Sequence, residues 1–268
     1  MASVTAHLMG GLGNQLFQIA TAYAYAKRFH RSPIFLKVWP HSSNRPPVWD
    51  TYLDSSRWTF HTSLYGFVML HESGFSFQDL PPPINNTQLY GYFQSSKYFS
   101  PYEDEIRSLL QVNDTLLKLY HIPSTVFEGY IGAHVRRGDY MIHPEVHNVC
   151  SQSYYTGARD YIDPQKPVFW ITDDPGWVNE HMVRPGDTVL SSETVQDFTR
   201  LSQFKDIIMS NSSFSWWATW LNPIGHVDRK ICCPNKWFGS KGPQDYATVY
   251  EPGWSKIDTI SGKVVEQD

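Results

Sequence analysis

The residues with the clearest chemical capacity are two adjacent arginines followed by an acid, in the segment HVRRGDY at residues 134–140. An apolar run precedes them and predicts a buried strand at residues 126–135, whose carboxyl end would present the arginines. Side chains two positions apart on a strand share a face, so His134 and Arg136 are expected to point the same way. A guanidinium there can bind a phosphate through two parallel hydrogen bonds. The alternative is an Arg–Asp pair on the surface at a strand end.

A second candidate is the serine-rich segment SNSSFSWWATWL at residues 210–221. Small hydroxyl and amide side chains stand between a predicted strand at residues 206–209 and a very apolar helix at residues 212–221. The N–H groups and the positive dipole end of a helix start bind anions, and Ser212 or Ser213 can add a hydroxyl. The alternative is an ordinary helix N-cap. We interpret the tryptophans of this helix as core residues rather than as a sugar-stacking platform.

Two further segments follow predicted strands. Asp173 and Asp174 can hold a divalent metal, cap the helix after Pro175 or bind a ribose, and without a histidine or third acid nearby a metal is disfavoured. The segment GGLGNQ at residues 10–15 allows the backbone to approach a ligand closely. It lacks the third glycine of the dinucleotide fingerprint and the acid about 20 residues further on, which disfavours a nicotinamide cofactor.

Strands alternating with helices must position these segments. Residues 3–9 and 33–38 are predicted strands around a helix at residues 14–29, which makes a β-α-β unit. A helix is predicted at residues 102–120, and residues 39–86 are interpreted as loops and short pieces. Beyond residue 124 a parallel, doubly wound sheet is predicted, with strands at residues 126–135, 168–172, 189–190, 206–209 and 230–233 and helices at residues 151–162, 194–204 and 212–221.

The carboxyl ends of these strands are where a ligand is expected, because open α/β sheets bind ligands there. Arg136 and the start of the helix at residue 212 would converge on a pyrophosphate without a metal. The sequence therefore predicts a pocket for a nucleoside diphosphate, with the glycine-turned unit on the other side of a cleft.

The composition limits the classes of protein. Aromatic residues make up 15% and charged residues 18% of the 268 residues, which excludes a disordered chain. A net charge of −4 provides no broad basic field for nucleic acid. Three cysteines make no disulfide framework, and neither a signal peptide nor an apolar run of about 18 residues is present. We expect a cytoplasmic protein with no integral membrane segment.

Six motifs, in order from about residue 7 to residue 257, resemble those of the α-1,2-fucosyltransferases, glycosyltransferase family 11. They are GGLGNQLFQ (10–18), GYFQSSKYF (91–99), HVRRGDY (134–140), TDD (172–174), SNSSFSWWATWL (210–221) and CPNKWF (233–238). The resemblance implies an α/β fold of the GT-B type, with two Rossmann-like domains facing across a cleft. Residues 1–124 would form the acceptor-side domain and residues 125–268 the domain that binds GDP-fucose.

The resemblance also implies a reaction: inverting transfer of L-fucose from GDP-β-L-fucose to the 2-hydroxyl of a galactose in a glycan, without a metal or other cofactor. Gly13, Asn14 and Gln15 would lie on the fucose or acceptor side. Acceptor choice is expected to depend on residues 39–86, which match no motif. Donor binding would fall to His134, Arg136, Asp173, Asp174, Asp197, Asn211, Ser212, Ser213 and Phe214.

Arg136 and Asp139 are the candidate catalytic residues. Arg136 would stabilise the charge that grows on the leaving diphosphate. Asp139 is the candidate general base, with structural pairing to Arg137 or a backbone turn as the alternative and Glu145 as a weaker candidate. A dissociative transition state would need no base.

The sequence is also compatible with three rival functions. The first is transfer to another acceptor, protein or sugar, or of another sugar from GDP. The second is non-catalytic glycan binding, and the third is a nicotinamide-dependent oxidoreductase.

Overall fold

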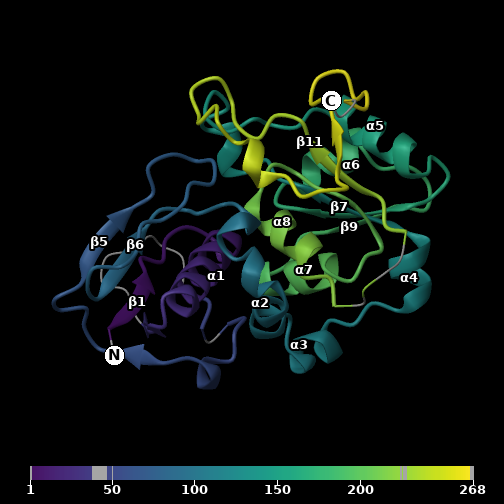
Figure 1. Cartoon of the computed structure of the whole chain (residues 1–268). Coiled ribbons are helices and arrows are strands. Elements are labelled where there is room, and N and C mark those ends of the chain that lie inside the picture. Colours follow the sequence, from purple (N-terminus) through teal and green to yellow (C-terminus); the bar gives the residue numbers. More distant parts are fainter. Residues whose placement is uncertain (1, 38–46, 50, 224, 226–227, 266–268) are drawn as a thin grey trace. The chain divides into compact units, whose positions relative to one another are not determined.

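The computed structural model describes residues 2–37, 47–49, 51–223, 225 and 228–265 (Figure 1). The chain forms two compact units. The first combines Met1–Asn113 with Asp245–Glu251, and the second combines Asp114–Gln244 with Pro252–Asp268. The sequence interpretation divides the chain once, after residue 124, whereas the segment Asp245–Glu251 returns to the first unit. Both units contain a parallel sheet with helices, so the expected α/β fold class is confirmed.

The second unit is built on a six-stranded sheet in the order β12-β11-β10-β7-β8-β9. Neighbouring strands are parallel throughout. Strand β7 is central and fully buried, which explains its continuous apolar character. The strands are β7 (Ile131–Val135), β8 (Val168–Thr172), β9 (Thr188–Leu190), β10 (Asp206–Ile208), β11 (Ile231–Pro234) and β12 (Ser255–Ile257).

Helices cover both faces of this sheet. Helices α5 (Gln152–Ile162) and α6 (Pro175–His181) bury apolar side chains, Tyr154 and Val178 among them, in one core with alternate residues of β7. The other residues of β7 face α7 (Thr194–Leu201) and α8 (Ser213–Trp220). A Cβ at Gly132 would lie 2.6 Å from the Phe204 ring, so only glycine fits there. The tryptophans of α8 are buried, as predicted.

Two elements predicted between residues 102 and 135, where the chain passes from the first unit to the second, are wrong in part. The first half of the strand predicted at residues 126–135 is helix α4 (Ser124–Gly129), and the strand ladder begins only at Ile131, whose N–H bonds Pro167. The helix predicted at residues 102–120 is two helices, α2 (Glu103–Leu110) and α3 (Asp114–Leu119). The break has a local cause, because Asn113 and Asp114 favour turns and helix starts over helix interiors.

The first unit contains a four-stranded parallel sheet in the order β2-β1-β6-β5. Helix α1 (Leu12–Arg28) packs on β1 and β2, and a parallel pair joins β3 to β4. The strands are β1 (Ser3–Ala6), β2 (Ser32–Pro33), β3 (Phe35–Leu36), β4 (Phe60–His61), β5 (Val68–His71) and β6 (Thr87–Tyr90).

Residues 39–86, predicted as loops and short pieces, contain the short strands β4 and β5, and β6 begins just after this region at Thr87. Strand β5 has four residues and lies at the sheet edge with most side chains exposed, so its sequence lacks an alternating pattern. Residues 38–46 and 50, which belong to predicted elements of this region, lie outside the described residues.

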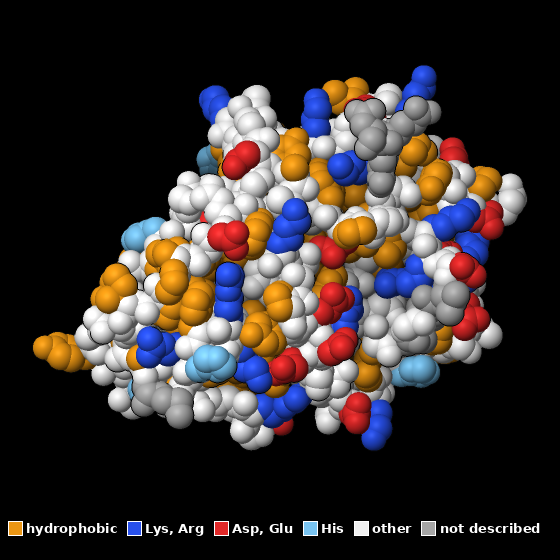
Figure 2. Space-filling model, in the orientation of Figure 1, with side chains coloured by type: hydrophobic (Ala, Val, Ile, Leu, Met, Phe, Trp, Pro, Cys, Tyr) orange, Lys and Arg blue, Asp and Glu red, His pale blue; other side chains and the backbone are white. Residues whose placement is uncertain are grey.

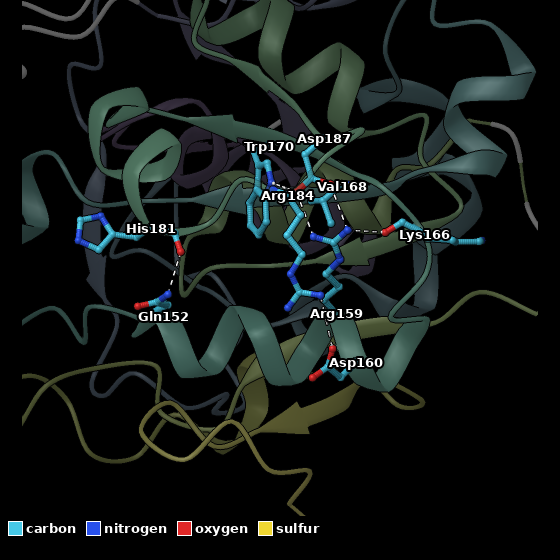
Figure 3. Close-up of polar contacts among 9 residues, drawn as sticks. All are labelled: Gln152, Arg159, Asp160, Lys166, Val168, Trp170, His181, Arg184 and Asp187. Atoms are coloured by element: carbon cyan, nitrogen blue, oxygen red, sulfur yellow. Dashed lines mark hydrogen bonds and ion pairs between the residues drawn. The ribbon is translucent and has the colours of Figure 1, made fainter.

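A buried ion pair fixes the amino end of β8 (Figure 3). Arg159 Nη1 on α5 lies 3.0 Å from Asp187 Oδ2, and the two side chains are 4% and 0% exposed. Asp187 also accepts hydrogen bonds from Val168 N and from the indole Nε1 of Trp170. The network anchors β8 at one end, so its other end presents Thr172 and the following acids in a fixed position.

The surface carries mixed charge. Figure 2 shows acidic and basic side chains interspersed over the visible face. Within the described ranges, no helix is both long enough and apolar enough to span a bilayer.

Candidate active site

Arg136 follows β7 and is bound by two carboxylates. Its Nη2 lies 2.6 Å from Asp139 Oδ1, and its Nη1 lies 2.9 Å from Asp173 Oδ2. The side chain is 23% exposed. The Arg–Asp pair considered from the sequence is therefore present, but Asp139 binds Arg136 rather than Arg137. A guanidinium has five N–H donors, so two such contacts leave donors for a ligand oxygen.

Arg137 turns to other partners. Its Nε lies 3.0 Å from Asp174 Oδ2, and its guanidinium carbon lies 4.1 Å from the centre of the Trp177 ring. Its backbone N–H donates to Asp173 Oδ1 at 2.8 Å. Asp173 therefore binds both arginines, one through the side chain and one through the main chain. A Cβ at Gly138 would lie 2.6 Å from Asp173 Oδ2, so another residue here would displace this carboxylate.

Asp174 caps helix α6. Its Oδ1 accepts from Trp177 N at 3.1 Å, and this hydrogen bond is the largest cause that lowers the pKa of Asp174. The capping interpretation of the sequence is confirmed. Among the described residues, no group of three or more His, Cys, Asp or Glu side chains is placed to hold a metal.

His134 is buried at the end of β7 and is neutral. Burial, and then the charge of Arg136, lowers its pKa to about 3. A hydrogen bond of 2.9 Å joins its Nδ1 to Ser210 Oγ, and its ring lies 4.8 Å from that of Phe214. The imidazole is therefore a polar but uncharged side chain packed between β7 and the start of α8.

The start of α8 is connected to Arg136 through Tyr140. Ser212 Oγ accepts from Phe214 N at 3.3 Å, so the N-cap interpretation is confirmed. The Tyr140 hydroxyl donates to Asn211 O at 3.1 Å, and the Arg136 guanidinium carbon lies 5.4 Å from the centre of the Tyr140 ring. Mainly because of burial, the pKa of Tyr140 rises to about 12, which keeps the hydroxyl a donor.

Tyr140 was not among the predicted site residues, although it ends the HVRRGDY motif. Its aromatic ring next to two arginines was the available signal, since arginine commonly packs on aromatic faces. Other predicted residues have structural partners. Asn211 Nδ2 donates to Trp237 O at 2.8 Å, which holds the CPNKWF segment, while Ser213 and Phe214 remain partly exposed.

Asp197 lies on α7 and is 7% exposed. Its Oδ2 accepts from Ser192 N at 3.0 Å, and Arg200 Nη1 lies 3.9 Å from its Oδ1. Within the described part of the chain, Oδ1 has no hydrogen-bond partner. Burial raises the pKa of this carboxyl. Phe198, the next residue, packs edge-on against Phe214 and so holds α7 against the start of α8.

In the first unit, Asn14 and Gln15 follow the glycine turn and make different contacts. Gln15 is 3% exposed; its Nε2 donates to Gly10 O at 3.0 Å, and its Oε1 accepts from Val48 N at 3.1 Å. These contacts hold the turn. Asn14 is half-buried, and its Oδ1 accepts from Gln94 Nε2 at 2.9 Å. Gly13 is buried at the start of α1.

Known proteins with sequence similarity define the class. A model of "Glycosyl transferase family 11" matches residues 2–258. The "O-antigen biosynthesis glycosyltransferase WbnK" of Escherichia coli is 27% identical over 285 residues, covering 86% of this chain and 93% of that protein. An "Alpha-1,2-colitosyltransferase" of Escherichia coli is 26% identical, covering 89% and 93%. "Galactoside alpha-(1,2)-fucosyltransferase 2" of Oryctolagus cuniculus is 27% identical, covering 81% and 66%.

The protein is therefore a glycosyltransferase with an α/β fold. It belongs to glycosyl transferase family 11. Among solved structures, NodZ alpha-1,6-fucosyltransferase co-crystallized with GDP matches with a TM-score of 0.55 and 15% identity, covering 82% of this chain and 92% of that one. POFUT1 in complex with GDP matches with a TM-score of 0.51 and 11% identity, covering 82% and 93%. At these identities the similarity establishes the fold alone.

Proposed function

We propose that the protein transfers L-fucose from GDP-β-L-fucose to the 2-hydroxyl of a galactose in a glycan, with inversion and without a metal. The second unit would bind the donor and the first unit the acceptor, in an enzyme of the GT-B type. The observation that carries the proposal is Arg136 at the carboxyl end of β7, connected through Tyr140 to the start of α8, in a member of family 11.

The diphosphate is the group that this arrangement suits. As the bond between the anomeric carbon and the β-phosphate oxygen breaks, negative charge grows on the leaving GDP. Arg136 and the α8 start supply a cation and a helix N-terminus, both of which favour negative charge. Asp139 and Asp173 hold the guanidinium in place, and a phosphate oxygen would bind its remaining donors.

Asp197 supports a guanine base as the nucleoside. Its buried Oδ1 has no hydrogen-bond donor among the described residues, and an unsatisfied buried carboxylate oxygen is costly. The N1–H and 2-amino groups of guanine are donors that a carboxylate accepts together. We therefore assign Asp197 to base recognition and expect Asp197→Asn to weaken GDP more than UDP, measured by calorimetry on both nucleotides.

The acceptor hydroxyl forms its new bond to the anomeric carbon from the face opposite the departing phosphate, and its proton must leave. Asp139 stays a candidate for the base, and its described contact is with Arg136. The half-buried Asn14 is the polar group of the glycine turn that we assign to the acceptor sugar.

Transfer assays test the proposal directly. GDP release from GDP-fucose is measured with a panel of galactosides, and the product linkage is determined by NMR. An α-linked fucose on the 2-hydroxyl, formed equally well in EDTA, supports the proposal. A linkage with retained configuration, or activity abolished by EDTA and restored by a divalent metal, contradicts it.

A second donor sugar enters the panel because one relative is named a colitosyltransferase. That name gives the same α-1,2 linkage, so the candidates differ in the sugar that is transferred. Comparing kcat/KM for GDP-fucose and GDP-colitose separates them, and a clear preference for colitose would replace fucose in the proposal.

A further inference from the structure

Glu72 lies at the carboxyl end of the first unit's sheet, directly after β5. Its Oε2 accepts from Tyr92 N at 2.7 Å, and Phe93 N lies 3.0 Å from both carboxylate oxygens. Its own N–H donates to Tyr90 O at 2.9 Å, which extends the pairing of β5 and β6 by one step. One side chain thus fixes the backbone of the loop that follows β6.

The loop has a conformation that needs such a partner. Phe93 adopts φ of +54°, in the left-handed region that L residues rarely occupy. A Cβ at Gly91 would lie 2.4 Å from the Cβ of Glu72, so glycine is required for the carboxylate to approach. Gly91 and Phe93, the two constrained backbone positions of this loop, therefore lie on either side of Tyr92, whose N–H binds Glu72.

The residue after this strained position reaches the glycine turn. Gln94 is 7% exposed, and its Nε2 donates to Asn14 Oδ1 at 2.9 Å. This hydrogen bond fixes the orientation of the Asn14 amide, with its Oδ1 toward Gln94. The other end, Nδ2, lies over Gly10, where an added Cβ would be 2.4 Å away. Gly10 adopts φ of +78°.

We propose that Glu72 is a positioning residue for the acceptor: through the loop at Tyr92 and Phe93 it places Gln94, which orients the Asn14 amide toward the acceptor sugar. The proposal rests on the proposed function, because that function assigns Asn14 to the acceptor. Glu72 does not serve as the base in this scheme, since its oxygens are engaged by backbone amides.

The Glu72 carboxylate is held in an environment that disfavours its charged form. Burial raises the pKa of Glu72 to about 7, and the nearby charge of Asp245 adds to the rise. Other titratable groups close to Glu72 are Tyr98, whose own pKa Glu72 helps to raise, the adjacent His71, and Tyr90 and Tyr92, whose backbones it contacts. Burying a charged carboxylate costs stability. Residues that reduce stability in this way are typical of functional sites.

The test is a double-mutant cycle on acceptor kinetics. Glu72→Gln is expected to lower kcat/KM for the acceptor on the order of 10²-fold, as small displacements of positioning groups do, with GDP affinity unchanged. If Glu72 acts through Asn14, adding Glu72→Gln to Asn14→Ala should change kcat/KM by less than about threefold. Glu105→Gln removes the same charge elsewhere in this unit, at an exposed site that contacts Tyr23 and Lys27, and should leave activity unchanged.

Additive losses in the double variant, or an equal loss of GDP affinity, would overturn the positioning role. Gln94→Met keeps Glu72 in place and must reproduce the acceptor-specific defect, which covers the case in which Glu72→Gln does not fold. The side-chain amide resonances of Asn14 provide a readout independent of turnover: if they are the same in wild type and Gln94→Met, the proposal fails. A wild-type protein that transfers no sugar would contradict the proposed function instead.

Discussion

The carboxyl ends of the two parallel sheets are built with different chemistry. In the second unit the contacts join charged side chains, with Arg136 bound to two aspartates and Arg137 to a third. In the first unit the contacts run mostly through backbone amides and neutral amide side chains, as between Gln94 and Asn14. Glu72 is the charged member of that set, and its partners are N–H groups of the main chain.

The difference corresponds to the two substrates of the proposed reaction. A diphosphate carries charge that grows during transfer, and preorganised charges stabilise it. A neutral sugar presents hydroxyl groups, for which oriented amides are suitable donors and acceptors. Under the proposed function, the same topological position in the two units would serve two kinds of recognition, and each can be disturbed separately.

The largest expected effect is on stability, through the buried ion pair that anchors strand β8 of the second unit. Asp187→Ala leaves Arg159 buried and unpaired, and breaking such a pair costs about 3–5 kcal/mol. Urea unfolding should show this loss in the second unit. Asp160→Ala removes an exposed partner of Arg184, 3.9 Å away, and is the matched control with little expected loss. Equal stability of the two variants would contradict the role of the buried network.

Arg136→Ala tests the charged contacts at the carboxyl end of the second unit's sheet. Loss of a preorganised donor to the leaving group should lower kcat about 10²–10³-fold, or about 3–4 kcal/mol. Arg136→Lys should recover little, because a single ammonium cannot reproduce the planar fork. Steady-state kinetics with GDP calorimetry measures both, and a folded, fully active Arg136→Ala enzyme would remove this residue from the mechanism.

Glu72→Gln tests the carboxyl end of the first unit's sheet, and its effect is measured as a change in the free energy of unfolding. The pKa of Glu72 rises from 4.5 to about 7 on folding, so the stability linked to this group is complete below about pH 4.5 and is lost as pH rises through 7. The stability of Glu72→Gln relative to wild type should therefore improve by about 2–3 kcal/mol between pH 5 and pH 8.

Urea titrations at the two pH values provide this measurement. Glu105→Gln is the control, because hydrogen bonds to Tyr23 and Lys27 lower the pKa of Glu105 and place its titration below this range. A pH-independent difference for Glu72→Gln would show that the carboxylate carries no desolvation penalty.

Asp139→Asn is expected to have the smallest effect. The carboxylate is engaged by Arg136, so its loss should loosen the guanidinium and lower kcat by less than about tenfold. The acidic limb of the pH–rate profile should persist. Disappearance of that limb in this variant alone would identify Asp139 as the base.

Much of the second unit could be predicted from its sequence because its signals are local. Strand β8 has the predicted bounds, since a continuous apolar run between turn residues defines it. The Ser212 cap and the Asp174 cap follow from side chains next to the amides that they bind. The caps and the strand end together place most of the candidate donor residues.

The first unit was less predictable because its contacts join distant residues. Glu72 binds amides about 20 positions away, and Gln94 reaches Asn14 across 80 positions. Neither contact leaves a periodic pattern in the sequence. Gln15, predicted to face a ligand, is buried and holds the turn, and a glutamine in a motif does not by itself reveal such contacts.

The short return segment Asp245–Glu251 has a consequence for engineering. It contributes the Thr248 hydroxyl that accepts from Phe77 N at 2.7 Å and the Asp245 carbonyl that accepts from Ser76 Oγ, also at 2.7 Å. An amino-terminal fragment that stops at residue 113 would lose both. Chimeras that exchange the first unit, the proposed acceptor side, must therefore exchange two separate stretches of sequence, because a single crossover would divide one compact unit.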